Sequence, residues 1–192
     1  MIKFFLACLK ERRCLLQPIE AAQLMLALEA VNKIPGDIAE IGSFEGVSAK
    51  LLAATDRGRT LHIFDTFEGL PEPGKKDSRG FYSGQYRASE AEVKKYLQDF
   101  SVRIYKGFFP STAGPIADKT FAFVHLDVDL YDSTKACLEF FYPRMASGGI
   151  ILTHDYAARD EGVYRAFQEF FADKREPIIE LGGNQGMVVK LC

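Results

Sequence analysis

The chain has 192 residues, of which 47% are hydrophobic and 26% are charged, and its formal net charge at pH 7 is −2. This length and composition are typical of one water-soluble globular domain, and they exclude a disordered chain and a membrane-embedded one. Acidic and basic residues are mixed along the chain without a basic stripe, which argues against nucleic acid as a partner.

Two helices are predicted within residues 1–34. The first spans residues 2–14 and is amphipathic, because the charged run Lys10–Arg13 follows too soon for the apolar stretch of a secretory or lipoprotein signal. The second spans residues 18–32. It begins at Pro18, and proline is favoured in the first turn of a helix.

From residue 37 onwards, short apolar runs alternate with helical stretches, a rhythm typical of β-α-β units. Five strands are predicted, at Asp37–Ile41, Thr60–Phe64, Val102–Tyr105, Phe121–Leu126 and Gly149–Thr153. Helices are predicted at residues 45–55, 89–99, 132–146 and 160–173. The chain ends in a predicted antiparallel hairpin of Pro177–Leu181 and Met187–Leu191. Residues 1–192 are therefore expected to form a single α/β domain: a Rossmann-like, seven-stranded, mostly parallel sheet with helices on both faces.

Residues 66–88 interrupt this rhythm. The segment is rich in glycine, proline and charged residues, and Phe67, Phe81, Tyr82 and Tyr86 are spread through it. Long irregular segments in compact domains are usually functional lids or disordered. The aromatic residues favour a lid over a binding site rather than a flexible tether.

The first strand turns into a helix within Ala39–Ser48, where Gly42 and Gly46 can bring a ligand close to the backbone. A tight turn without a ligand is the alternative. The loop lacks the G-x-G-x-x-G fingerprint of dinucleotide sites and the Gly-Lys-Ser/Thr of phosphate-binding loops. Glu40 would repel phosphate but suits the ammonium or sulfonium end of a zwitterion, so a cationic cofactor is favoured. Asp65 ends the second strand, where this fold places an acid on ribose hydroxyls, although such an acid can also cap a turn.

Acidic residues gather after the fourth and fifth strands. Asp127 and Asp129 follow the apolar run of the fourth strand, and His154-Asp155 follows the fifth. Because neighbouring parallel strands end at one sheet edge, Asp127 and Asp155 are expected to converge there. A buried carboxylate at that edge needs a metal, an amine or a substrate hydroxyl as its partner. Oxygen ligands with one imidazole are compatible with magnesium or manganese, and His154 shifts the preference toward softer metals.

Other polar residues are assigned structural roles or none. Asp132 or Ser133 is suited to cap the helix that follows the fourth strand. His62 and His125 lie inside apolar strands, where histidine is more often hydrogen-bonded structure than catalyst. The cysteines are scattered without a Cys-x-x-Cys pair, which argues against a zinc site or a disulfide framework and for a reducing cytoplasm. They are Cys8, Cys14, Cys137 and Cys192.

From about residue 37 to its end, the chain resembles the macrocin O-methyltransferase family. The segments that carry the resemblance are Ala39–Ser48, Asp65–Pro71, Lys106–Pro110, Leu126–Thr134 and Gly148–Tyr156. The most specific are Asp-Thr-Phe-Glu-Gly-Leu-Pro and Asp-Val-Asp-Leu-Tyr-Asp-Ser-Thr. The resemblance implies a class I methyltransferase fold with S-adenosylmethionine at the first two strands. The candidate cofactor-binding residues are Glu40, Gly42, Ser43, Gly46, Ser48, Asp65, Thr66 and Phe108.

The resemblance also implies a magnesium site at Asp127 and positions 154 and 155, with Asp129 as the base. This sequence departs from the family at His154, where relatives have an acid, so the affinity for the metal or its identity is expected to differ. The region before residue 37 is also short for the family. Contacts that longer N-terminal segments make to substrates or to a second subunit are therefore expected to be absent.

The expected reaction is O-methylation of a hydroxyl on a sugar or another small metabolite. The acceptor oxygen attacks the sulfonium methyl, while Asp129 or His154 accepts the proton and a cation at Asp127, His154 and Asp155 acidifies the hydroxyl. A methyltransferase-like binding or scaffold protein without turnover is the first alternative. The second is a glycosyltransferase, because Asp127-Val128-Asp129 also matches a D-x-D motif. A homodimer stays open.

Overall fold

The computed structural model describes residues 2–157, 159 and 162–192, and its centre is a seven-stranded sheet. The strands are β1 (Asp37–Ile41), β2 (Leu61–Asp65), β3 (Val102–Lys106), β4 (Phe121–Leu126), β5 (Met145–Thr153), β6 (Ile179–Glu180) and β7 (Gly186–Val189). Their order is β3-β2-β1-β4-β5-β7-β6. The first five run parallel, and β7 is antiparallel to both β5 and β6. The predicted sheet and its terminal hairpin are confirmed.

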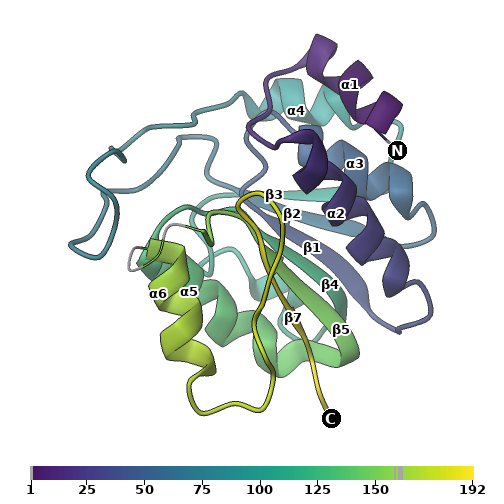
Figure 1. Cartoon of the computed structure of the whole chain (residues 1–192). Helices are drawn as coiled ribbons and strands as arrows, with labels where there is room; N and C mark the ends of the chain where they lie inside the picture. The colour runs from purple at the N-terminus through teal and green to yellow at the C-terminus, as the bar shows by residue number, and fades with distance from the viewer. Residues whose placement is uncertain (1, 158, 160–161) are drawn as a thin grey trace.

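Helices cover both faces of the sheet (Figure 1). They are α1 (Ile2–Glu11), α2 (Pro18–Ala30), α3 (Val47–Thr55), α4 (Glu90–Tyr96), α5 (Tyr131–Phe141) and α6 (Gly162–Phe171), with short 3₁₀ turns η1 (Gly114–Ile116) and η2 (Tyr142–Arg144). The first four gather on one face and α5 and α6 on the other. Within the described residues, no helix is long and apolar enough to cross a membrane.

The central strand β4 shows why the sheet must be covered twice. Its sequence, Phe-Ala-Phe-Val-His-Leu, is buried at every position. Phe123 packs in the core beneath α2 and α3, whereas Val124 packs in the core beneath α5 and α6. A continuous apolar strand flanked by parallel neighbours is typical of doubly covered α/β sheets.

Several helices end before their predicted bounds, and the helix expected at 89–99 covers only Glu90–Tyr96. The helix expected at 2–14 ends at Glu11. The helix expected at 132–146 ends at Phe141, and β5 begins at Met145, four residues before the predicted strand. Met145 pairs with Phe121 of β4, so sheet hydrogen bonds override the local helical pattern. The first residues of the helix expected at 160–173 lie outside the described part of the chain.

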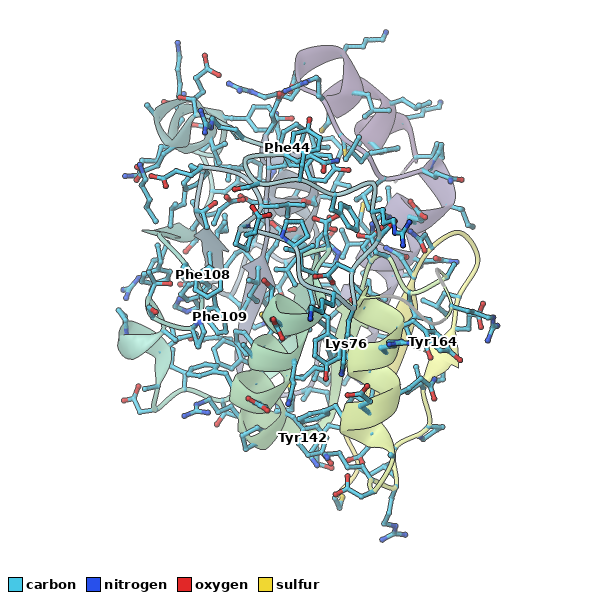
Figure 2. All side chains as sticks on the ribbon, turned by 90° about the vertical axis from the view of Figure 1, so that its left-hand side faces the viewer. Phe44, Lys76, Phe108, Phe109, Tyr142 and Tyr164 are labelled. Atoms are coloured by element: carbon cyan, nitrogen blue, oxygen red, sulfur yellow. The ribbon has the colours of Figure 1, made fainter. Side chains whose placement is uncertain are left out.

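Residues 66–88 form a long loop without helix or strand, as predicted. Its two ends are joined, because Leu70 N donates to Gln85 O and Gly84 N donates to Leu70 O. Its middle is held by α5, since Tyr131 N donates to Asp77 Oδ1 at 2.7 Å. Lys76 lies between α5 and α6 (Figure 2), where its ammonium group contacts Glu169. The loop is therefore fastened at both its base and its tip.

Candidate active site

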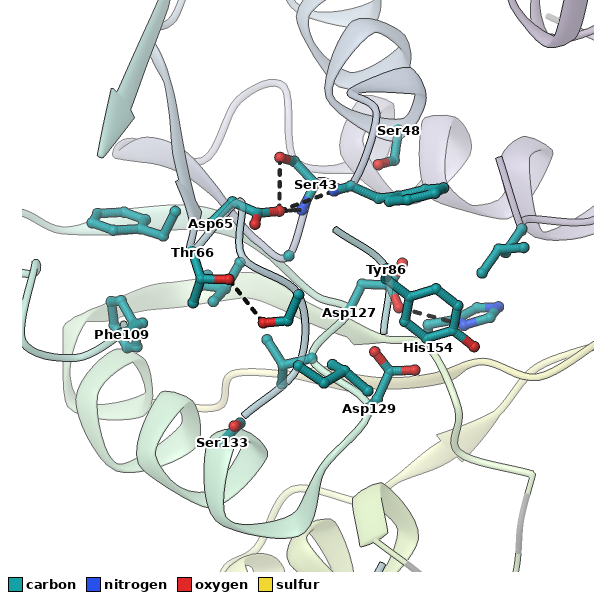
Figure 3. A pocket seen from close by; sticks show the side chains of 18 of the residues that line it. Ser43, Ser48, Asp65, Thr66, Tyr86, Phe109, Asp127, Asp129, Ser133 and His154 are labelled. Carbon is teal, nitrogen blue, oxygen red and sulfur yellow. Dashed lines mark hydrogen bonds and ion pairs between the residues drawn. The ribbon is translucent and has the colours of Figure 1, made fainter. Parts of the chain in front are cut away.

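One cavity of about 280 Å³ opens at the carboxyl edge of the sheet (Figure 3). Its walls come from the ends of β1, β2, β4 and β5, from the 66–88 loop and from the segment between α1 and α2. Ten of the residues proposed from sequence line it: Gly42, Ser43, Ser48, Asp65, Thr66, Phe108, Asp127, Asp129, His154 and Asp155. The strand tips that the sequence pattern placed at one edge thus share one cavity.

The β1–α3 loop is shaped by its contact with the end of β4. Asp127 N donates to Ile41 O at 2.9 Å, which draws the two strand ends together. Gly42 has a φ of +84°, and a Cβ there would lie 1.8 Å from Asp127 O. Glycine is required at this position by the protein's own backbone, whether or not a ligand also approaches it.

Asp65 organises the same loop. Its Oδ2 accepts hydrogen bonds from Ser43 N at 2.7 Å, Phe44 N at 2.9 Å and the Ser43 hydroxyl at 3.1 Å (Figure 3). Its Oδ1 accepts one bond, from Phe67 N at 2.7 Å. Oδ1 therefore accepts fewer bonds than Oδ2 and can accept another from a ligand. Both readings from sequence, a turn cap and a ribose ligand, are compatible with this geometry.

Asp127, His154 and Asp155 come together at the β4 and β5 tips. His154 Nδ1 lies 3.5 Å from Asp127 Oδ1 and 3.2 Å from Asp155 Oδ2. One ligand atom from each of the three residues lies within 4.8 Å of the others, a spacing that a single metal ion can bridge. The donor set of two carboxylates and one imidazole fits a divalent cation.

Burial and neighbouring charges shift the pKa values of three groups at the β4 and β5 tips. Burial raises the pKa of Asp127, and the charge of His154 opposes part of that rise. Burial and the carboxylates of Asp155 and Asp127 raise the pKa of Asp129 well above its usual value. Burial alone would lower the pKa of His154, but Asp127 and Asp155 outweigh it and raise the value to about 10. The surplus of buried negative charge favours a bound cation.

Backbone strain is concentrated around the cavity. In the described part of the chain, five residues other than glycine have positive φ: Phe44, Phe67, Tyr86, Asp129 and Asp155. Four of them line the cavity, and the fifth, Phe67, donates its backbone N–H to Asp65. Such conformations cost on the order of 1 kcal/mol each and cluster at functional sites.

Two predicted cofactor residues do not line the cavity. Glu40 is fully buried, and its Oε1 lies 3.0 Å from His125 Nδ1. Gly46 faces α4, where a Cβ would lie 3.1 Å from Val93 Cγ1. Their direct contact with a cofactor stays a prediction that this geometry does not support.

The other histidines predicted to be structural have hydrogen-bond partners. His125 pairs with Glu40, and both ring nitrogens of His62 have partners 3.0 Å away, in Asp37 and Tyr105. Neither histidine lines the cavity.

Residues 13–16 and Tyr86 form a part of the cavity wall that was not predicted from the sequence. Arg13, Cys14, Leu15 and Leu16 line the cavity from between α1 and α2. This segment has no motif, and only the packing of α1 and α2 on the sheet brings it there. Tyr86 had a weak signal, as one of the aromatic residues in the 66–88 loop.

Comparisons with known proteins agree with this arrangement. A methyltransferase from Streptomyces olivaceus, named 8-demethyl-8-(2,3-dimethoxy-alpha-L-rhamnosyl)-tetracenomycin-C 4'-O-methyltransferase, is 30% identical over 159 residues, or 74% of this chain and 61% of that relative. The demethyldecarbamoylnovobiocin O-methyltransferase of Streptomyces niveus is 31% identical over 65% of this chain and 54% of its own length. This chain therefore spans little more than half the length of these two curated relatives.

Solved structures show the same fold. The O-methyltransferase NovP is 26% identical with a TM-score of 0.77, over 90% of this chain and 79% of its own. A calicheamicin methyltransferase, 21% identical, has a TM-score of 0.78 over 88% of this chain and 77% of its own. The family model described as macrocin-O-methyltransferase (TylF) matches residues 18–183. The chain belongs to the macrocin O-methyltransferase family.

Proposed function

We propose that this protein binds S-adenosylmethionine and transfers its methyl group to a hydroxyl of a sugar or another small molecule. The observation that carries the proposal is the single cavity onto which the glycine loop, Asp65 and the acid–histidine cluster (Asp127, His154 and Asp155) all open. Family membership supports the reaction class. The names of the two relatives describe O-methyltransferases of glycosylated or antibiotic-related molecules, which supports a sugar-like acceptor.

The cofactor half of the cavity lies between the β1 and β2 tips. Gly42 and Ser43 present backbone groups to the cofactor at the β1–α3 loop, and Asp65 Oδ1 can accept a hydrogen bond from a ribose hydroxyl. Thr66 and the half-exposed ring of Phe108 extend the wall beyond Asp65, and Ser48 faces the cavity from α3. These residues present polar groups and one aromatic surface, as a nucleoside with an amino-acid tail requires.

The acceptor half lies between the β4 and β5 tips. Asp127, His154 and Asp155 would hold a divalent cation, magnesium or another, and such a cation acidifies a bound hydroxyl. Asp129 accepts the hydroxyl proton. Asp129 lines the same cavity as the cluster, and His154 is the other candidate base, for a site in which no cation occupies its ring nitrogen. The acceptor oxygen gains the methyl, and the sulfonium leaves as a neutral thioether.

Calorimetry and a methyl-transfer assay test this function. S-adenosylmethionine should bind the wild type and bind Asp65→Ala at least about tenfold more weakly, because both the ribose contact and the loop support are lost. Asp127→Asn should retain cofactor binding and lose methyl transfer to an identified acceptor. Unchanged binding in Asp65→Ala would remove the cofactor site from this position. Cofactor binding without transfer to any sugar, phenol or small hydroxylated metabolite would favour the scaffold alternative.

Several expectations from sequence remain predictions. These are the cytoplasmic location, a homodimer, and the absence of nucleic-acid and membrane partners. The glycosyltransferase alternative leaves the β1–β2 half of the cavity without a role, so a thermal-shift response to S-adenosylmethionine but not to nucleotide sugars is expected.

A further inference from the structure

Glu20 of α2 is a fully buried acid that the proposed reaction does not use. Its Oε2 accepts a hydrogen bond from Gln17 N at 2.7 Å, and its Oε1 accepts one from Asn184 N at 2.8 Å. The same Oε2 lies 3.2 Å from His154 Nε2. A buried carboxylate is costly unless it is paired, so Glu20 depends on these partners. It therefore connects α2 directly to the acid–histidine cluster.

The two ring nitrogens of His154 face in different directions. Nε2 faces Glu20, whereas Nδ1 faces Asp127 and Asp155 in the cavity wall. Glu20 Oε2 approaches Nε2 at ion-pair distance without hydrogen-bond alignment, so the charge of Glu20 lies beside this edge of the ring while Nδ1 faces the two carboxylates. In metalloproteins, a histidine ligand usually donates its second N–H to a carboxylate or carbonyl, which fixes its tautomer and orientation.

Asn184, in the turn between β6 and β7, connects Glu20 to the cluster a second time. Its backbone N–H donates to Glu20, and its Nδ2 donates to Asp155 Oδ1 at 2.9 Å. The neighbouring Gly183 has a φ of +82°, and a Cβ there would lie 2.7 Å from Glu20 Oε1. The glycine-rich turn, which the sequence analysis assigned only to a hairpin, closes tightly on Glu20.

We propose that Glu20 and Asn184 are positioning residues that direct His154 Nδ1, together with Asp127 and Asp155, at a divalent transition-metal ion. This proposal rests on the proposed function, because it assigns the cation of that site. Compared with a site of three carboxylates, the imidazole of His154 removes one negative charge and adds a softer donor. This change weakens the binding of magnesium relative to cobalt, manganese or zinc. The outer carboxylate makes the imidazole a better donor.

Calorimetry with Co²⁺ and Mg²⁺ on metal-free protein tests the proposal, with visible absorption of the Co²⁺ complex as a second readout. The variants are Glu20→Ala, Asn184→Ala and His154→Asp. Glu176→Gln is the matched control, because Glu176 is another buried and hydrogen-bonded glutamate outside the cavity wall. Circular dichroism establishes whether each variant is folded. If Glu20→Ala is not folded, Asn184→Ala tests the proposal in its place.

The dissociation constant for Co²⁺ should rise by about 10–100-fold in Glu20→Ala and several-fold in Asn184→Ala, and it should be unchanged in Glu176→Gln. His154→Asp should lower the preference for Co²⁺ over Mg²⁺ by at least about tenfold and change the Co²⁺ spectrum. Identical Co²⁺ spectra for the wild type and His154→Asp would overturn the proposal. So would a wild type that binds neither ion while His154→Asp binds Mg²⁺, because His154 would then occupy the cation's place.

Calorimetry with S-adenosylmethionine on the same samples separates this inference from the proposed function. If the Co²⁺ and Mg²⁺ measurements contradict the proposal while cofactor binding and methyl transfer persist, only the metal assignment is lost. If the wild type does not bind the cofactor, the proposed function is lost, and the metal results stand on their own.

Discussion

Gly42 illustrates how single residues hold the candidate site together. From sequence, this glycine was attributed to the close approach of a ligand, whereas in the structure the protein's own backbone requires it. Its positive φ and its contact with Asp127 O let the ends of β1 and β4 approach each other. Asp65 then ties the following residues to β2. The loop is therefore preorganised by main-chain contacts before any ligand binds.

Gly42→Ala should lower the free energy of unfolding by about 2–4 kcal/mol, because the added Cβ meets Asp127 O and the left-handed backbone is strained. Urea denaturation measures the change. Gly114→Ala is the control, since a Cβ at Gly114 has no heavy atom within 4 Å, and its effect should stay within about 0.5 kcal/mol. Equal stabilities for Gly42→Ala and the wild type would mean that β1 and β4 do not approach this closely.

At the scale of elements, the 66–88 loop brings together residues that the sequence could not pair. Its tip is held by the first residue of α5, and Lys76 contacts α6 and the ring of Tyr131. The second half of the loop brings Tyr86 to the cavity, edge-on to Phe44. The loop therefore has defined attachments, and its predicted role as a lid over the binding site stays a prediction.

Asp77→Ala should loosen this loop, because Asp77 accepts backbone hydrogen bonds from Tyr131 and from Gly74, both at 2.7 Å. Losing a charged acceptor costs about 1.5–3 kcal/mol, so hydrogen-exchange protection within residues 66–88 should fall by roughly tenfold or more. The exposed Arg79 in the same loop offers the control Arg79→Ala, for which protection should not change. If both variants exchange like the wild type, the tip is not held through Asp77.

At the scale of the whole molecule, Glu176 connects the chain's C-terminal end to the segment after α5. Its carboxylate accepts hydrogen bonds from the Tyr142 hydroxyl, Lys190 Nζ and Leu191 N. Burial alone would raise the pKa of Glu176, but these donors outweigh it and lower the pKa to about 2. Such a group stabilises the fold only while it is ionised.

The pH dependence follows from the lowered pKa. Glu176 stabilises the fold fully at a pH above the pKa that it has in the unfolded chain, about 4.5. This stabilisation is lost as the pH falls toward 2. At pH 6, Glu176→Gln should be less stable than the wild type by on the order of 2 kcal/mol, and the gap should close by about pH 2. Urea unfolding across this range measures it, with the exposed Glu29→Gln as control. A gap that does not depend on pH would contradict the assignment.

Much of this protein was predictable from local patterns. Continuous apolar runs such as Phe121–Leu126 predicted strands buried on both faces, and the specific segments starting at Asp65 and Asp127 identified the family. The prediction was weaker where long-range pairing overrides local preference. Met145 belongs to β5 because Phe121 lies opposite it, and no local signal around residue 145 indicates this.

The sequence by itself determined the order of the elements and which acids end which strands, because hydrophobic periodicity and strand-end position are local properties. Only the tertiary structure decided the partners of those acids. It paired Glu40 with His125 away from the cavity, brought Arg13–Leu16 into the wall, and set Glu20 behind His154. These contacts join residues up to 164 positions apart, as Glu20 and Asn184 show, and such contacts depend on how helices pack on the sheet.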